Sequence, residues 1–149
     1  MHYLDVADRM WPLLHRIMRG HAALYRATGG RVGGRLPGLP PMLLLDHVGA
    51  RSGKSRTTPL VYMRDGEDLI VVAAKGGHPQ DPAWVGNLRA HPETEVQLGA
   101  TRMPVRARVA DRTERKRLWP RAVEHNPLWG SYQHRTTREV PLVILTPRS

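Results

Sequence analysis

Short apolar stretches separated by glycine and proline constrain the fold of this chain more than any other feature. Glycine and proline number 14 and 13 in 149 residues, above average usage, which favours short strands and many turns over a helical bundle. Asp65-Gly66 stands between two of the stretches and is a hairpin signal. We therefore predict five or six strands from the segments 41–48, 57–64, 69–74, 95–98, 103–109 and 140–145.

Helical periodicity is confined to the N-terminus and to two later segments. Over residues 3–25 apolar side chains recur every three or four positions, and a glycine pair ends this helix. Asp81 at the cap position and Pro82 in the first turn predict a short helix over 81–90, and Asp111 begins another. The apolar face of the first helix is expected to consist of Tyr3, Val6, Met10, Leu13, Leu14, Ile17 and Leu24.

Strands dominate this pattern, and strand and helix do not alternate regularly as they would in a doubly wound sheet. Mostly antiparallel strands predict an α+β fold that is mainly β, a barrel or half-barrel. We expect an N-terminal helix and connector over residues 1–40, and the barrel with its inserted helices over residues 41–149.

Several kinds of chemistry are excluded by what the chain lacks. Without cysteine it has no disulfides, thiolate nucleophiles or iron–sulfur ligands, and its eight histidines show no metal-ligand spacing, so we predict no metal site. The longest apolar runs are far shorter than the ~20 residues that span a bilayer. Asp5 and Asp8 occupy the place of a signal peptide's basic region, so we expect a cytoplasmic protein.

The net charge of +10 comes almost entirely from arginine, whose planar fork of donors suits phosphate and carboxylate. A nucleic acid is disfavoured because only 5% of residues are aromatic and no RNA-binding signature is found. Arg9, Arg16 and Arg19 lie opposite the apolar face of the first helix. This helix could lie on an anionic membrane, at the inner face of the plasma membrane, or it could pack on the domain.

The segment 49–55 resembles a phosphate-binding P-loop but has one residue too few, and Ser55 leads into a strand instead of a helix. A glycine-flexed loop with Arg51, Lys54 and Arg56 remains, and it is either an anion site or an ordinary polar hairpin. Further on, Ala73-Ala74-Lys75 and two glycines follow an apolar strand. Small residues there could admit a flat ring, or form a simple strand end and turn.

Three ordered motifs resemble the deazaflavin-dependent nitroreductase family. They are VGARSGKSRTTPL from Val48, AKGG from Ala74 and DPAWVGNLRAHP from Asp81, and the likeness continues through Trp119-Pro120, Tyr132 and Arg138-Glu139-Val140-Pro141. The resemblance implies a split β-barrel similar to the FMN-binding proteins. It also implies that the chain binds coenzyme F420, a deazaflavin with a ribityl phosphate and an oligoglutamate tail.

Site residues follow from the same resemblance. Contact with the acidic tail is implied for Ala50, Arg51 and Ser52, and Lys54 belongs to the same cationic loop. The phosphate and the deazaflavin ring would be lined by Arg56, Thr57, Thr58, Pro59, Leu60, Val61, Val72, Ala73, Ala74 and Lys75. The remaining side would be covered by Ala83, Trp84, Val85, Gly86 and Asn87.

The acceptor side departs from the best-known family members, which carry a tyrosine cluster where this chain has Asn126, Trp129 and Tyr132. Tyr132 is the candidate catalytic proton donor and Trp129 is expected to stack on the ring or the substrate, unless both are core residues. The resemblance implies a reductase that transfers hydride from reduced F420 to a small acceptor, a quinone, enone or nitro compound. We expect a monomer or a homodimer. The alternative is an F420-binding carrier with little turnover.

Overall fold

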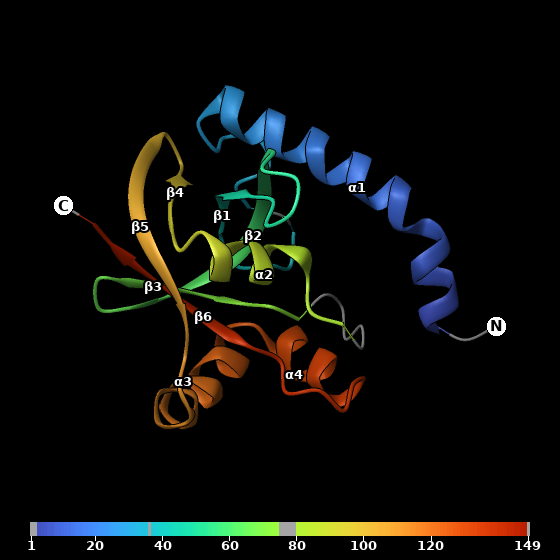
Figure 1. Cartoon of the computed structure of the whole chain (residues 1–149), viewed down its shortest axis with the longest axis vertical. Helices are drawn as coiled ribbons and strands as arrows, with labels where there is room; N and C mark the ends of the chain where they lie inside the picture. Colours follow the sequence, from blue (N-terminus) through green and yellow to red (C-terminus); the bar gives the residue numbers. More distant parts are fainter. Residues whose placement is uncertain (1–2, 36, 75–79, 149) are drawn as a thin grey trace.

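The computed structural model describes residues 3–35, 37–74 and 80–148. Six strands form a closed antiparallel barrel in the order β1-β2-β3-β6-β5-β4 (Figure 1). The strands are β1 (Met42–Val48), β2 (Ser55–Asp65), β3 (Asp68–Val72), β4 (Glu93–Leu98), β5 (Thr101–Val109) and β6 (Leu142–Pro147). The helices are α1 (Tyr3–Thr28), α2 (Ala83–Ala90), α3 (Arg112–His125) and α4 (Pro127–His134). The predicted fold class, a mainly β barrel with an N-terminal helix and inserted helices, is confirmed.

Two local features explain how the barrel closes. The turn between β2 and β3 is built on Gly66, whose φ of +60° suits glycine, and Asp65 pairs with Asp68 across it. Strand β1 then pairs with β4 through Leu44 and Leu45, so the sheet has no free edge at this seam.

The barrel interior is filled by alternate residues of the strands. Leu43 and Leu45 of β1 point inward with Val71, Val105 and their equivalents, because side chains alternate along a strand. From α2, the side chains of Trp84, Val85 and Leu88 pack into the same core.

A second apolar layer lies on the outside of the barrel. Helices α3 and α4 cover the outer face of β3 and β6, where Leu118 and Trp129 pack against Ile70 and Ile144. In Figure 1 these two helices lie on the opposite side of the barrel from α1.

The packing face of α1 differs from the predicted one. Ala22 and Tyr25 are buried against Leu44 of β1, whereas Leu13, Ile17 and Leu24 are each about half exposed, at 53%, 58% and 54%. Figure 1 shows why: the N-terminal part of α1 extends beyond the barrel and only its C-terminal part lies on it. No helix in the described parts of the chain is both long and apolar enough to cross a membrane.

The helix starts were predicted unequally well. Asp111 caps α3 by accepting from the amide of Glu114, whose side chain bonds back to the Asp111 amide. The cap predicted at Asp81 is wrong: Pro82 is the N-cap of α2, without a side-chain bond, and Asp81 pairs instead with Arg138. Helix α4 was not predicted from its pattern at all.

Candidate functional site

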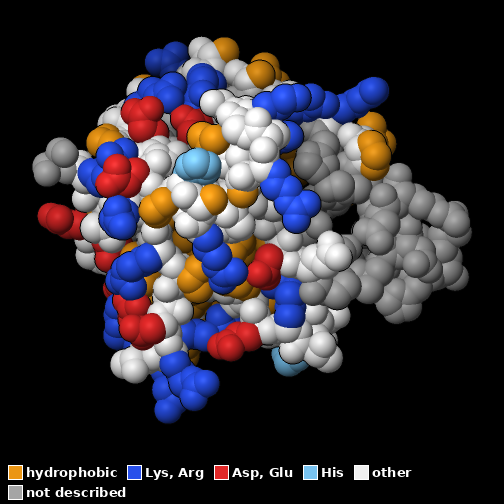
Figure 2. All heavy atoms as spheres, in the orientation of Figure 1, with side chains coloured by type: hydrophobic (Ala, Val, Ile, Leu, Met, Phe, Trp, Pro, Cys, Tyr) orange, Lys and Arg blue, Asp and Glu red, His pale blue; other side chains and the backbone are white. Residues whose placement is uncertain are grey.

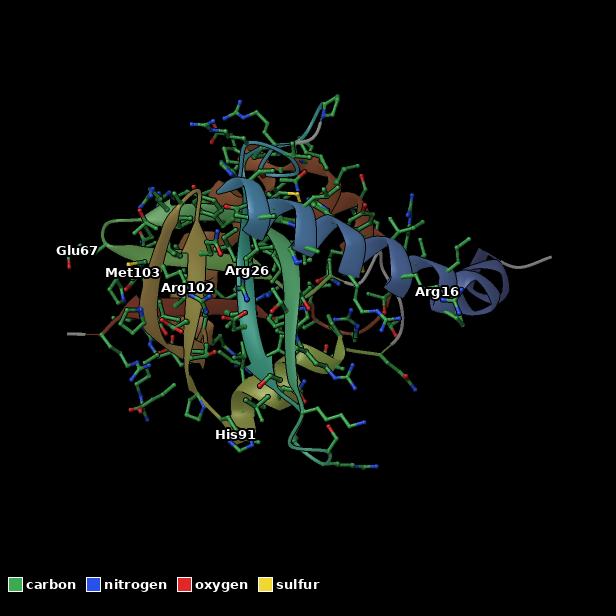
Figure 3. The ribbon with its side chains drawn as sticks, turned by 90° about the horizontal axis from the view of Figure 1, so that it is seen from above. Arg16, Arg26, Glu67, His91, Arg102 and Met103 are labelled. Carbon is green, nitrogen blue, oxygen red and sulfur yellow. The ribbon has the colours of Figure 1, made fainter. Side chains whose placement is uncertain are left out.

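A groove of about 1630 Å³ lies where α1, α2 and the first two strands meet. It is lined by these four elements, by the β1–β2 loop, and by a few residues of β3, β4, β5 and the C-terminal segment. Figure 3 shows α1 crossing above the strands, with Arg26 and Arg102 side by side beneath it and Arg16 farther toward the N-terminal end. Of the two alternatives for this helix, packing on the domain is therefore the one that the structure shows for its C-terminal part, which also lines the groove.

The β1–β2 loop is held in a tight conformation by its own backbone. The amide of Gly49 donates to the carbonyl of Lys54 over 2.9 Å, and the amide of Gly53 donates to the carbonyl of Gly49 over 2.9 Å. Gly53 has φ +68°, which favours glycine, and a Cβ at Gly49 would lie 2.3 Å from the Ser52 hydroxyl oxygen. The glycines thus allow a sharp bend that exposes the side chains of Arg51 and Ser52.

Cations in the groove are of two kinds. Arg26 and Arg102 both bind Asp46, over 2.9 Å each, and Thr57 donates to the same carboxylate. Arg51 and Arg56, by contrast, have no ion-pair partner among the described residues. On the face that Figure 2 shows, Lys and Arg side chains are interspersed with Asp and Glu. Uncompensated arginines in a groove make it a candidate anion site.

Beside these cations lies a chain of buried polar groups. His47 is 5% exposed; its Nε2 lies 2.8 Å from the Thr58 hydroxyl oxygen and its Nδ1 lies 2.9 Å from Nδ2 of Asn87. The Asn87 Oδ1 accepts from the amide of Ala50 over 3.0 Å. Burial, and secondarily the nearby Arg56, lowers the pKa of His47 from 6.5 to about 4, although Asp46 opposes this, so the ring is neutral near pH 7.

Eleven of the sequence-predicted binding residues line the groove together. They are Ala50, Arg51, Ser52, Arg56, Thr57, Thr58, Leu60, Val72, Ala83, Trp84 and Asn87. The amide of Ala50 is already bound to Asn87, so only its side chain and carbonyl are open to a ligand.

Other predicted residues lie elsewhere. Ala73 and Val85 are in the barrel core, Val61 and Ala74 belong to the apolar layer under α3 and α4, and Pro59 is buried on β2. Lys54 and Gly86 are exposed but do not line the groove, and Lys75 is outside the described residues. Trp129 is 5% exposed in the apolar layer, and Tyr132 packs at its edge with the Arg135 guanidinium 5.4 Å from its ring.

The sequence prediction missed several parts of the groove, among them His47, Arg102 with Arg148, and the lining residues within 18–26 of α1. His47 follows Leu43 and Leu45 at the inward spacing of β1, so its position could have been inferred from that alternation. The other residues reach the groove only through tertiary packing, for which one sequence carries no local signal.

Comparisons with known proteins show which family the chain resembles. The family model of the F420H(2)-dependent quinone reductases matches residues 17–147. An F420H(2)-dependent quinone reductase of Mycobacterium tuberculosis is 43% identical over 136 residues, covering 89% of this chain and 91% of the relative.

Two solved structures are also similar. One, described as an F420-H2 dependent reductase, is 38% identical with a TM-score of 0.65, covering 70% of this chain and 93% of the other. Another, described as a domain-swapped dimer, is 32% identical with a TM-score of 0.67, covering 93% and 98%. The match over residues 17–147 means that this chain belongs to the F420H(2)-dependent quinone reductase family, whose members are reductases that use coenzyme F420.

Proposed function

We propose that coenzyme F420 binds in the groove, with Arg51 and Arg56 at its acidic tail, and that the enzyme reduces a quinone there by hydride transfer. The observation that carries this proposal is that Arg51 and Arg56, which have no ion-pair partner among the described residues, share one groove with apolar side chains. A polyanionic tail attached to a flat ring needs that combination.

The donor set of the groove fits this cofactor. Arg51, Arg56 and the hydroxyl of Ser52 offer charge-assisted and neutral hydrogen bonds to phosphate or carboxylate. Leu60, Val72 and Trp84 offer apolar surface that would orient a ring and exclude water from it. When bound, coenzyme F420 supplies the hydride, so the protein's own contribution is binding and orientation.

The acceptor is proposed to be a quinone because the family model and the mycobacterial relative both carry that name. Enones and nitro compounds are further candidates from the sequence resemblance. Tyr132 stays the proposed proton donor, although it does not line the groove among the described residues.

The oligomeric state and the contact with a membrane are two further proposals. A homodimer is favoured over a monomer by the relative described as a domain-swapped dimer. Contact of α1 with an anionic membrane stays a prediction, and sedimentation with anionic vesicles tests it. The exposed Leu13 and Ile17 are the side chains that such a contact would bury.

Anaerobic turnover tests the proposal against the carrier alternative. Reduced F420 is mixed with catalytic amounts of protein, menadione is added, and the return of the oxidised cofactor is followed by fluorescence. We expect many equivalents of cofactor to be oxidised per protein, at a rate proportional to protein concentration. A single stoichiometric equivalent, or none above the protein-free rate, would identify a carrier and contradict the proposal.

A further inference from the structure

Hydrogen bonds link Ala50, Asn87, His47 and Thr58 in a row beside the groove, and the Ala50 amide fixes which group donates in each of them. The Ala50 amide can only donate, so the side-chain oxygen of Asn87 must accept from it. The Asn87 nitrogen then faces Nδ1 of His47 and donates to it. Because Nδ1 accepts, the proton of the neutral His47 ring is on Nε2, which faces Thr58.

Thr58 is the last residue in this row of hydrogen bonds. Its hydroxyl oxygen accepts from His47 Nε2 over 2.8 Å, which leaves the hydroxyl proton to be donated elsewhere. Thr58 lines the groove and has no hydrogen-bond acceptor for that proton among the described residues. The proton is therefore available to a ligand in the groove.

We propose that His47 is a positioning residue of the cofactor site, which holds the Thr58 hydroxyl as a donor to an oxygen of the bound ligand. The inference rests on the proposed function, since the ligand oxygen is taken to belong to coenzyme F420. His47 itself need not touch the cofactor: it acts through Thr58, while Asn87 links the same ring to the Ala50 end of the anion-binding loop.

If the His47 proton were on Nδ1 instead, Nε2 would accept the Thr58 hydroxyl proton, and Thr58 would offer the ligand only lone pairs. The charged groups that act on the ring are Arg56 on β2 and Asp46 on its own strand, and α2 contributes the neutral Asn87. These hydrogen bonds thus make Thr58 selective for ligand groups that accept hydrogen bonds, such as phosphate, hydroxyl or carbonyl oxygens.

Nitrogen NMR of the histidine rings shows which nitrogen of His47 carries the proton, and so tests the direction of these hydrogen bonds without any cofactor. In the wild-type protein His47 is expected to be neutral with its proton on Nε2 at pH 7. In Asn87→Asp the donor to Nδ1 is replaced by an acceptor, so Nδ1 of His47 is expected to carry a proton at the same pH. A wild-type ring with its proton on Nδ1, or an Nδ1 that stays unprotonated in Asn87→Asp, would overturn the proposal.

Fluorescence titration with F420 tests the role of Thr58. Thr58→Val and His47→Asn are each expected to weaken binding about tenfold, as for one lost hydrogen bond. The double variant should bind no worse than either single one, because both changes remove the same interaction. His47→Gln places an amide donor near the position of Nε2 and is expected to restore affinity to within about threefold of wild type.

Thr101→Val, a matched change at an exposed position of β5 outside the groove, is the control and should bind as wild type does. Additive losses in the double variant, or no rescue by His47→Gln in a folded protein, would mean that His47 only fills space. If wild-type protein fails to bind F420 at all, the proposed function fails, and the NMR result still decides the direction of the chain.

Discussion

The hydroxyl of Tyr25 accepts a 2.8 Å hydrogen bond from the amide of Gly99, although the two residues are 74 positions apart. The same hydroxyl lies 3.0 Å from the carbonyl of Met42, to which it donates. Burial raises the pKa of Tyr25, against the lowering effect of the Gly99 amide, so the phenol stays protonated near neutral pH. This one side chain attaches α1 to β1 and to the end of β4, at the seam where the barrel closes.

Removing that hydroxyl should destabilise the protein. Tyr25→Phe leaves the Gly99 amide without its acceptor, and we expect a loss of about 1–3 kcal/mol in the free energy of unfolding. Denaturant unfolding measures it. Tyr132→Phe is the matched control for stability, because the Tyr132 hydroxyl has no hydrogen bond within the described chain. Equal midpoints for the two variants would show that Tyr25 contributes through its ring alone.

The sequence predicted those features of the fold that neighbouring residues determine, and it failed where residues distant in sequence determine them. The strand positions and the Asp111 cap were predictable because alternation and the capping box lie within a few residues. Asp81 had the same local signal, but the tertiary partner Arg138 binds its carboxylate. Helix α4 could have been predicted from Asn126 followed by Pro127, a cap and first-turn pair, but its eight residues are too few for a clear period.

Trp129 should behave as a core residue when it is truncated. It is 5% exposed and packs with Leu118 and Ala122, so Trp129→Ala is expected to cost about 3–5 kcal/mol of stability. Thermal unfolding measures the loss. An unchanged melting temperature with a raised KM for menadione would instead make Trp129 a wall of the acceptor pocket.

Tyr132 is tested by its rate of turnover. If it donates the proton that accompanies hydride transfer, Tyr132→Phe should lower kcat by ~10²-fold with little change in F420 affinity. Steady-state kinetics with menadione measures both. Wild-type rates in this variant would leave solvent water as the source of the proton.

His47 should make stability depend on acidity in a defined window. Its pKa is about 4 in the folded protein and about 6.5 when unfolded, so the unfolded chain binds the extra proton first as pH falls. Its contribution is complete above pH ~6.5 and declines toward pH ~4, by on the order of 3 kcal/mol in total.

The measurement compares wild type with His47→Gln in denaturant unfolding between pH 4 and 7. The difference in stability between them should shift by that amount across the window, because glutamine does not titrate. His91→Gln, at an exposed histidine, is the control and should follow the wild-type curve. Parallel curves for wild type and His47→Gln would contradict a buried neutral ring.

Arg138 should hold together segments that are distant in sequence. Its guanidinium donates to the carbonyl of Ala74 over 2.9 Å and pairs with Asp81 over 2.9 Å, and its side chain is 14% exposed. Burial lowers its pKa, but the group stays a cation. Arg138→Met is expected to cost about 1–3 kcal/mol, whereas Arg112→Met on the exposed start of α3 should cost less than about 0.5. Equal losses in denaturant unfolding would show that the contacts of Arg138 are not stabilising.

Cofactor affinity in arginine variants of the groove tests the central claim most directly. Fluorescence titration of F420 compares wild type with Arg51→Ala, Arg56→Ala and the charge-matched control Arg112→Ala, whose side chain lies outside the groove. We expect each groove variant to lose about 1.5–3 kcal/mol of binding, roughly 10- to 100-fold, with the wild-type affinity falling as salt rises. The control should bind as wild type does. Groove variants that bind F420 as tightly as Arg112→Ala would contradict the assignment of this groove to the cofactor.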